Sequence, residues 1–128
     1  MTYGMSRTMD LSFDKTVLQV REALQDQGFG VLTEIDVAAT LKAKLGEDME
    51  DYLILGACNP PLAHRALGVD RSIGLLLPCN VVVRSSTDGT VVEIADPHML
   101  VGVTGEDALE PVATEARLRL DAVLAALG

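Results

Sequence analysis

The sequence is poor in aromatic residues, which make up 3% of the chain, and it contains no tryptophan. The only rings besides histidine belong to Tyr3, Phe13, Phe29 and Tyr52. Sites that hold sugars or nucleic-acid bases by stacking depend on such rings. The composition therefore argues against a binding site built on ring stacking.

Basic residues are also scarce, with 10 Lys and Arg against 19 Asp and Glu and a net charge of −9. DNA and RNA binding depends on cationic side chains that replace counterions on phosphates, and an anionic membrane surface repels an acidic protein. We therefore expect no nucleic acid and no membrane among the partners. The densest acidic segment, residues 47–51, is interpreted as a solvated loop, with a weak hard-cation site as the alternative, because it lacks EF-hand spacing.

Long apolar runs are absent too, since none approaches the roughly 20 residues that span a bilayer. The first residues show no secretory signal, so we expect a cytoplasmic protein whose thiols stay reduced. Hydrophobic residues nevertheless make up 48% of the chain, which is enough for a packed core. No repeat or linker divides the sequence, and we expect a single domain over residues 1–128.

The pattern of apolar and turn-forming residues predicts an α+β fold, in which helices cover one face of a mostly antiparallel sheet. Ser12, Asp36 and Asn59 each precede a helical pattern as an N-cap would. Pro78 interrupts an apolar stretch, so that strand is expected at the sheet edge or with a bulge. The predicted order is β-α-β-α-β-α-β-β-α, with strands at 3–11, 29–35, 52–57, 73–83 (interrupted) and 91–95, and helices at 13–27, 37–45, 60–67 and 106–127.

The sequence has two cysteines, Cys58 and Cys79, and each is followed by asparagine and flanked by proline. Both lie where an apolar run meets a turn-forming residue, so they could share a site where two strand ends meet. Their spacing is neither a CxxC motif nor half of a zinc knuckle. Converging thiolates could bind a soft metal such as Zn²⁺ or Cu⁺, a sulfur species or an electrophile. Burial as small apolar residues is the alternative.

Asparagine and histidine residues near the cysteines extend this candidate site. Asn59 is explained as a helix cap, whereas Asn80 interrupts an apolar strand and either fastens a bulge or points into a polar pocket. His64 follows Cys58 on the expected helix, but nothing marks an oxyanion hole or an orienting third group for a Cys-His pair. Asp36 is a cap with ligation or proton transfer as the alternative, and His98 matches no trusted zinc spacing.

No phosphate-binding loop, GxGxxG motif or nucleophile elbow is present in the sequence. Whether the protein is an enzyme is therefore uncertain, and the absence of a recognisable catalytic constellation favours a binding role. We rank binding of a small molecule or soft metal first. A structural or interaction domain with packed cysteines comes second, and a thiol-dependent enzyme in sulfur or redox chemistry comes third.

Three further stretches are distinctive in this order, namely Gly28-Phe29-Gly30-Val31-Leu32-Thr33-Glu34-Ile35-Asp36, Leu55-Gly56-Ala57-Cys58-Asn59-Pro60 and Leu76-Leu77-Pro78-Cys79-Asn80-Val81. Together they resemble the domain-of-unknown-function 302 (DUF302) family. The resemblance covers almost the whole chain and implies a compact α+β fold and a homodimer. It supplies no reaction. The signature positions that it implies are Asp36, Cys58, Asn59, Pro60, His64, Pro78, Cys79 and Asn80.

The ligand-binding site that follows from these observations consists of Cys58, Asn59, Cys79 and Asn80, with Asp36 and His64 at its edge. If a metal binds, Cys58 and Cys79 are its expected ligands.

Overall fold

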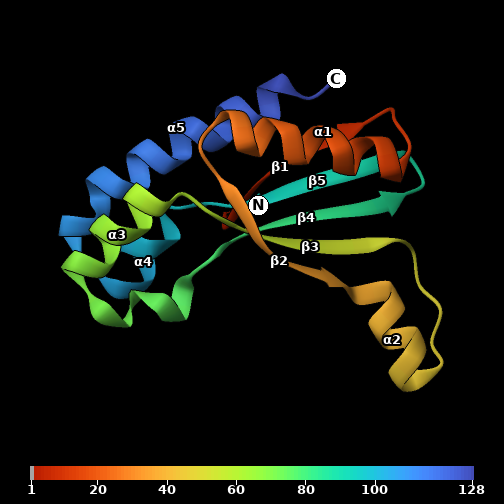
Figure 1. Ribbon diagram of the computed structural model, residues 1–128, viewed down its shortest axis with the longest axis horizontal. Coiled ribbons are helices and arrows are strands. Elements are labelled where there is room, and N and C mark those ends of the chain that lie inside the picture. Colours follow the sequence, from red (N-terminus) through yellow and green to blue (C-terminus); the bar gives the residue numbers. More distant parts are fainter. Residues whose placement is uncertain (1) are drawn as a thin grey trace.

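The computed structural model describes residues 2–128 and contains a five-stranded antiparallel sheet in the order β1-β5-β4-β3-β2 (Figure 1). The α+β fold and the predicted order of strands and helices are confirmed, with additional short helices. The strands are β1 (Gly4–Met9), β2 (Gly30–Asp36), β3 (Tyr52–Cys58), β4 (Cys79–Ser86) and β5 (Gly89–Ala95). The helices are α1 (Phe13–Asp26), α2 (Val37–Leu45), α3 (Pro60–Val69), η1 (Arg71–Leu76, 3-10), α4 (Met99–Thr104), η2 (Asp107–Leu109, 3-10) and α5 (Glu110–Ala126).

The predicted caps begin three of these helices. The side chain of Ser12 accepts a hydrogen bond from the backbone of α1, Asp36 Oδ1 accepts one from the Ala39 amide at 2.9 Å, and Asn59 Oδ1 accepts one from the Leu62 amide at 3.2 Å. These bonds satisfy backbone donors that the first helical turn leaves without partners. No helix within residues 2–128 is both long and apolar enough to cross a membrane.

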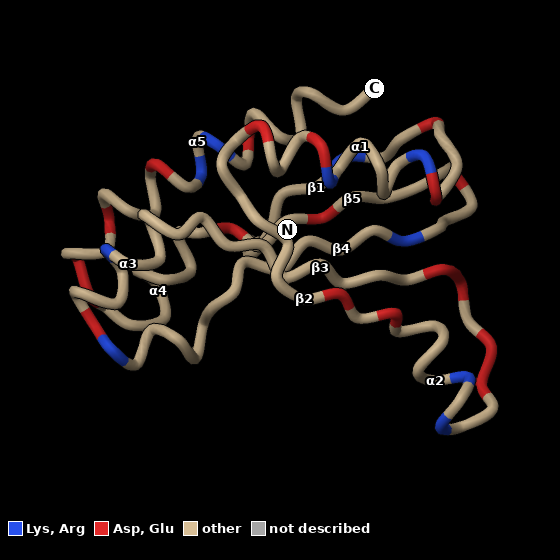
Figure 2. The backbone as a smooth tube through the Cα atoms, viewed as in Figure 1, with Lys and Arg blue, Asp and Glu red and all other residues tan. Residues whose placement is uncertain are grey.

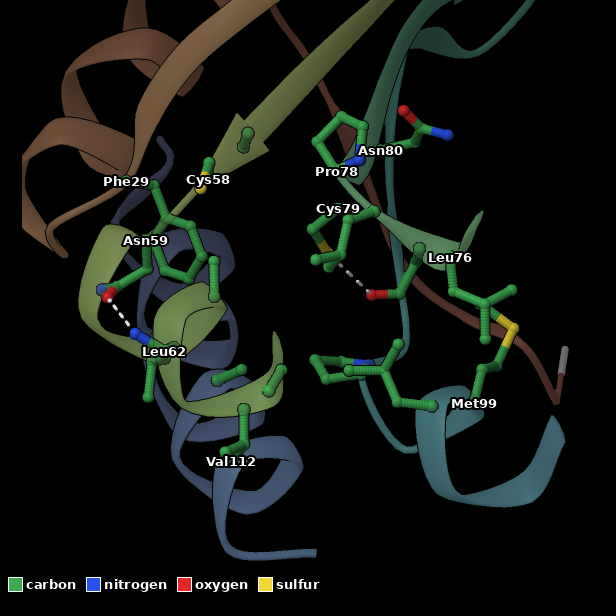
Figure 3. Close-up of a pocket in the computed structure, with 18 of the residues that line it drawn as sticks. Phe29, Cys58, Asn59, Leu62, Leu76, Pro78, Cys79, Asn80, Met99 and Val112 are labelled. Carbon is green, nitrogen blue, oxygen red and sulfur yellow. Dashed lines mark hydrogen bonds between the residues drawn. The ribbon is translucent and has the colours of Figure 1, made fainter. Parts of the chain in front are cut away.

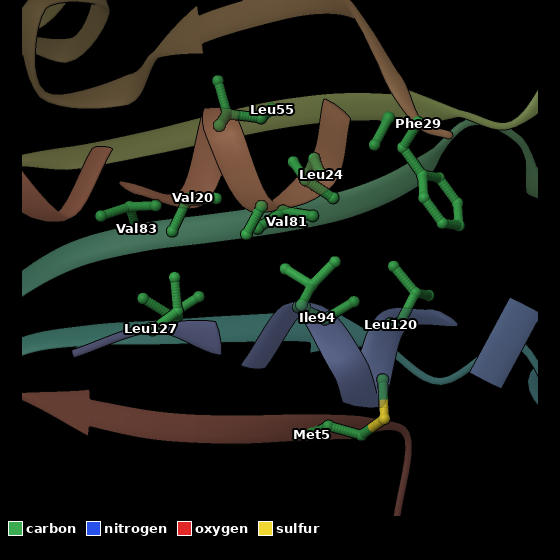
Figure 4. Close-up of a cluster of buried hydrophobic side chains, with 14 of the residues drawn as sticks. Met5, Val20, Leu24, Phe29, Leu55, Val81, Val83, Ile94, Leu120 and Leu127 are labelled. Atoms are coloured by element: carbon green, nitrogen blue, oxygen red, sulfur yellow. The ribbon is translucent and has the colours of Figure 1, made fainter. Parts of the chain in front are cut away.

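The main core lies between the sheet and the pair α1 and α5, which cover one face (Figures 1 and 4). Because side chains alternate along a strand, every second residue of the central strands points into this core. The fully buried members include Leu55 of β3, Val81 of β4 and Ile94 of β5. Leu24 of α1 and Leu120 of α5 belong to the same cluster, on the helical side of the core. The hydrophobic periodicity read from the sequence therefore matches the face that is buried.

A second, smaller core forms beyond one end of the sheet. Leu62 of α3, Ile73 of η1 and Val112 of α5 are buried there with Ala66 and Leu109. The helical cap, defined here as α3, η1, α4, η2 and the first half of α5, surrounds this cluster (Figure 1). The fold thus has two hydrophobic cores. The main core lies between the sheet and helices α1 and α5, and the second lies inside the helical cap.

Three local predictions differ from the structure. The apolar residues 73–77 were expected in a strand but lie mainly in η1, because Ile73 packs into the cap core. β4 begins after Pro78 and lies in the middle of the sheet, so the expected edge position is wrong. The bulge lies in β2, between Val31 and Thr33. Helix α4 was not predicted, since its six residues carry no buried side chain and little periodicity.

The charged residues are unevenly distributed. Figure 2 shows several of the acidic residues along the segment that runs from β2 through α2 to β3. Asp48 pairs with Lys42 at 2.8 Å in this segment, but both side chains are exposed, so the pair adds little stability. Residues 47–51 are exposed and lie outside any helix or strand up to Tyr52, as expected of a solvated loop.

Gly56 of β3 determines how closely β2 and the start of β4 approach this strand. A Cβ atom at this position would overlap Thr33 Oγ1 on β2 and lie 2.8 Å from Pro78 Cγ. Gly56 is paired with Thr33 on one side and with Asn80 on the other. Because Gly56 has no side chain, Thr33 of β2 and Pro78 before β4 can both lie close to the backbone of β3.

We expect Gly56→Ala to lower the free energy of unfolding by about 2–3 kcal/mol, because the added methyl group overpacks a closed site. Gly30→Ala is the matched control, since a Cβ there meets only Cys58 O at 4.0 Å. Urea denaturation of both variants measures the difference. Equal stability of the two variants would contradict this role for Gly56.

Candidate functional site

A cavity of about 570 Å³ lies between the end of the sheet and the helical cap (Figure 3). Three strand termini form one wall, because β3 ends, β4 begins and β5 ends at the same end of the sheet. Leu62 and Ala66 of α3, and Val112 of α5, form the opposite wall. The lining is mainly apolar. The residues that contribute to it are 29 and 32, 57–59, 62, 63 and 66, 75–80, 95–97, 99 and 100, 103, and 112 and 116.

Four of the six predicted site residues line this cavity, namely Cys58, Asn59, Cys79 and Asn80. Antiparallel pairing explains their proximity, since Ala57 is opposite Cys79 and Gly56 is opposite Asn80. The other two predicted residues lie elsewhere. Asp36 caps α2 at the end of β2 that lies away from the cavity, and His64 is exposed on α3. Neither residue lines the cavity.

The two thiols do not form a pair. Cys79 is opposite Ala57 rather than Cys58, and neighbouring residues of a strand point to opposite faces. Cys79 accordingly packs against the main core, whereas Cys58 is not part of that cluster. Both cysteines are free and half-buried. Among residues 2–128, no three His, Cys, Asp or Glu side chains converge as metal ligands, so the arrangement gives no support to a shared soft-metal site.

Cys79 has an environment that keeps its thiol protonated. Burial, and to a lesser extent the negative charge of Asp96, raises the pKa of Cys79 from 9.0 to about 12. The thiol instead donates a weak hydrogen bond to the carbonyl of Ala95 at 3.6 Å. Nucleophilic and metal-binding cysteines act as thiolates, so this position is unsuited to either role at neutral pH.

The two asparagines differ in burial and in role. Asn59 is buried and its Oδ1 atom caps α3, as the sequence predicted. Asn80 is exposed, and it pairs with Gly56 at a position where β4 carries no bulge. Its side chain is exposed because Asn80 belongs to the face of β4 opposite the main core, and its amide points away from the space between Phe29 and Met99 (Figure 3).

A polar network that the sequence analysis missed joins the sheet to the helical cap. Asp96 Oδ2 accepts a hydrogen bond from Arg117 of α5 at 2.8 Å, and Asp96 Oδ1 accepts one from the His98 amide at 2.9 Å. His98 Nδ1 is 3.2 Å from the same Oδ1 atom, and its Nε2 is 3.6 Å from Glu110. The sequence around Asp96 gives no local signal of this network, because its partner Arg117 lies far along the chain.

The raised pKa of Cys79 predicts a pH dependence of stability. The folded protein retains the thiol proton up to about pH 12, whereas the unfolded chain loses it near pH 9. Stability contributed by the protonated thiol is thus fully present below pH 9 and falls as pH rises between these values. We expect the difference in free energy of unfolding between the wild type and Cys79→Ala to shrink from pH 8 to pH 11 in urea titrations. A difference that stays constant over this range would contradict the assigned environment.

Comparisons with known proteins agree with the fold. Residues 5–127 match the model of a family described as "Domain of unknown function DUF302". The chain is similar to the solved structure "Crystal structure of uncharacterized conserved protein DUF302 from Bacillus stearothermophilus". The TM-score is 0.92 and the sequence identity 31%, and the match covers 100% of both chains. No curated protein matches the chain.

Proposed function

The chain belongs to the DUF302 family, and from the geometry of its cavity we propose that it is a small-molecule-binding domain. The observation that supports this proposal is the cavity of about 570 Å³ at the strand ends. Ligand sites in proteins have this size and combine an apolar wall with a few polar groups. Here Cys58, Asn59, Cys79 and Asp96 are those polar groups.

The position of the cavity between two separate cores also supports a binding role. Protein interiors are close-packed, and an unfilled volume lowers stability in proportion to its size. Larger side chains on the cap, at Ala63 or Ala116 for example, would reduce this volume, yet both positions carry alanine. A site kept open at a cost in stability favours a ligand as the reason for it.

A structural or interaction domain with packed cysteines is the second candidate. The observation that favours it is the packing of Cys79 against the main core, with its thiol bonded to Ala95. A thiol-dependent enzyme has less support, because burial raises the pKa of Cys79 and His64 lies away from the cavity. A cytoplasmic location stays a prediction.

Native mass spectrometry of freshly purified, chelator-free protein tests the binding proposal. We expect the wild type to carry a bound small-molecule mass, and Ala63→Phe to lose it because the ring occupies the cavity. Ala125→Phe is the matched control, since Ala125 is exposed on α5 and does not line the cavity.

If both variants retain the same bound mass, the cavity is not the site. If the wild type is a bare polypeptide and no added small molecule binds differently to Ala63→Phe and Ala125→Phe, the packed-cysteine alternative takes its place.

We also propose that the chain forms a homodimer. β2 is an edge strand of the sheet, and its Ile35 is exposed next to the start of α2. Helix α2, which follows it, has nine residues and none is buried. A helix of this length is marginal in water without packing, and unpaired strand edges favour association, so a second copy along β2 and α2 would stabilise both.

Sedimentation equilibrium at micromolar concentration tests the dimer. We expect twice the chain mass for the wild type and for Thr8→Lys on the opposite edge strand β1, but a monomer for Ile35→Lys. A monomeric wild type would refute the proposal.

A further inference from the structure

The charges around the cavity restrict what it can hold. Asp96 is the only acidic side chain of the lining, and within the described residues no Lys, Arg or His contributes to it. Both Asp96 oxygens are already engaged, one by Arg117 and one by His98. An anion inside the cavity would lie near this carboxylate without a counter-charge, and a cation would compete with Arg117 for it. Burying an unpaired charge costs several kcal/mol, so the cavity disfavours both.

Two polar groups of the wall already have hydrogen-bond partners within the protein. Cys79 donates to the carbonyl of Ala95, and Asn59 accepts from the amide of Leu62. Asn80 points out of the cavity (Figure 3). In residues 2–128, no buried side-chain nitrogen or oxygen lacks a hydrogen-bond partner. No buried side-chain nitrogen or oxygen of this wall therefore needs a polar ligand to complete it.

The mouth of the cavity is also apolar. Leu75 of η1 is 88% exposed, and Val103 of α4 is 67% exposed, although both line the cavity. Leu32 at the bulge of β2 adds a third exposed side chain to the same lining. Single exposed aliphatic residues are common, but several gathered around one opening mark a surface that binds apolar groups.

From these observations we infer that the cavity takes an uncharged aliphatic ligand, which enters past Leu75 and Val103. This inference rests on the proposed binding function and specifies its ligand class. Aliphatic rather than aromatic chemistry is favoured because Phe29 is the sole ring among the lining residues, and the rest of the apolar wall is Leu, Ala, Val, Pro and Met. The ligand is held by burial of its apolar surface. The hydrogen bonds from Cys79 to Ala95 and from Leu62 to Asn59 are kept when it binds.

Three compounds with one cyclohexyl ring and different heads test the inference. They are cyclohexylmethanol, cyclohexanecarboxylate and cyclohexylmethylammonium, titrated at pH 7 into ¹⁵N-labelled protein and followed by amide chemical shifts. We expect the alcohol to shift cavity amides such as those of Ala57, Leu62 and Leu100, with a Kd at least about tenfold lower than that of either ion, because only the ions lose solvation of a charge. Ala63→Phe should abolish these shifts, and Ala125→Phe should preserve them.

A gain-of-function variant tests the same point in the opposite direction. Met99 lines the cavity, and Met99→Lys should place a cation at its wall and improve carboxylate binding by at least about tenfold relative to the wild type. Leu76→Lys, at a more exposed lining position, serves as the second variant if Met99→Lys does not fold.

The outcomes separate the two proposals. Wild-type binding of either ion at the cavity as tight as that of the alcohol would overturn the neutral ligand class and leave the binding function standing. Cavity shifts with none of the three compounds would overturn both.

Discussion

The register between β3 and β4 is the constraint on which the candidate site depends. It places Ala57 opposite Cys79 and Gly56 opposite Asn80, and it thereby decides which residues point into the core and which point away. A slip by one residue would exchange the two faces and move Cys79 out of the core. Gly56 holds this register in place, because only a residue without a side chain fits beneath Thr33 and Pro78.

The cavity exists because the fold is assembled from two cores that meet incompletely. The main core packs α1 and α5 against the sheet, and the second core packs the helical cap against itself. Helix α5 contributes to both, with Val112 in the cap and Leu120 in the main core. Arg117, which lies on α5 between Val112 and Leu120, forms an ion pair with Asp96 at 2.8 Å. This ion pair joins the helix to the residue that follows β5. The space that remains is bounded by strand ends on one side and aliphatic helix residues on the other.

The parts of this architecture that depend on local physical chemistry could be predicted from the sequence. Asp36 and Asn59 are followed by helical patterns, and each caps a helix as expected. The proximity of Cys58 and Cys79 at strand ends was also predictable, since each lies where an apolar run stops. Their orientation was not, because it depends on a register set across two strands by Gly56.

Features that depend on distant partners could not be predicted in this way. The apolar residues before Pro78 have the composition of a strand, but Ile73 finds its partners in the cap core and the segment forms η1. Asp96 forms its ion pair with a residue 21 positions away. The apolar half of the cavity wall has the same composition as core, so the sequence directed attention to the thiols, whereas the aliphatic residues of the helical cap define the volume.

Diffraction from a crystal pressurised with xenon tests the central claim most directly, because xenon occupies apolar cavities that exclude ordered water. Our account predicts xenon density between Phe29, Ala66 and Leu100, with the positions of Cys79 and Ala95 unchanged. A hydrogen-bonded water cluster in that space, or a helical cap closed against the strand ends with no xenon bound, would contradict it.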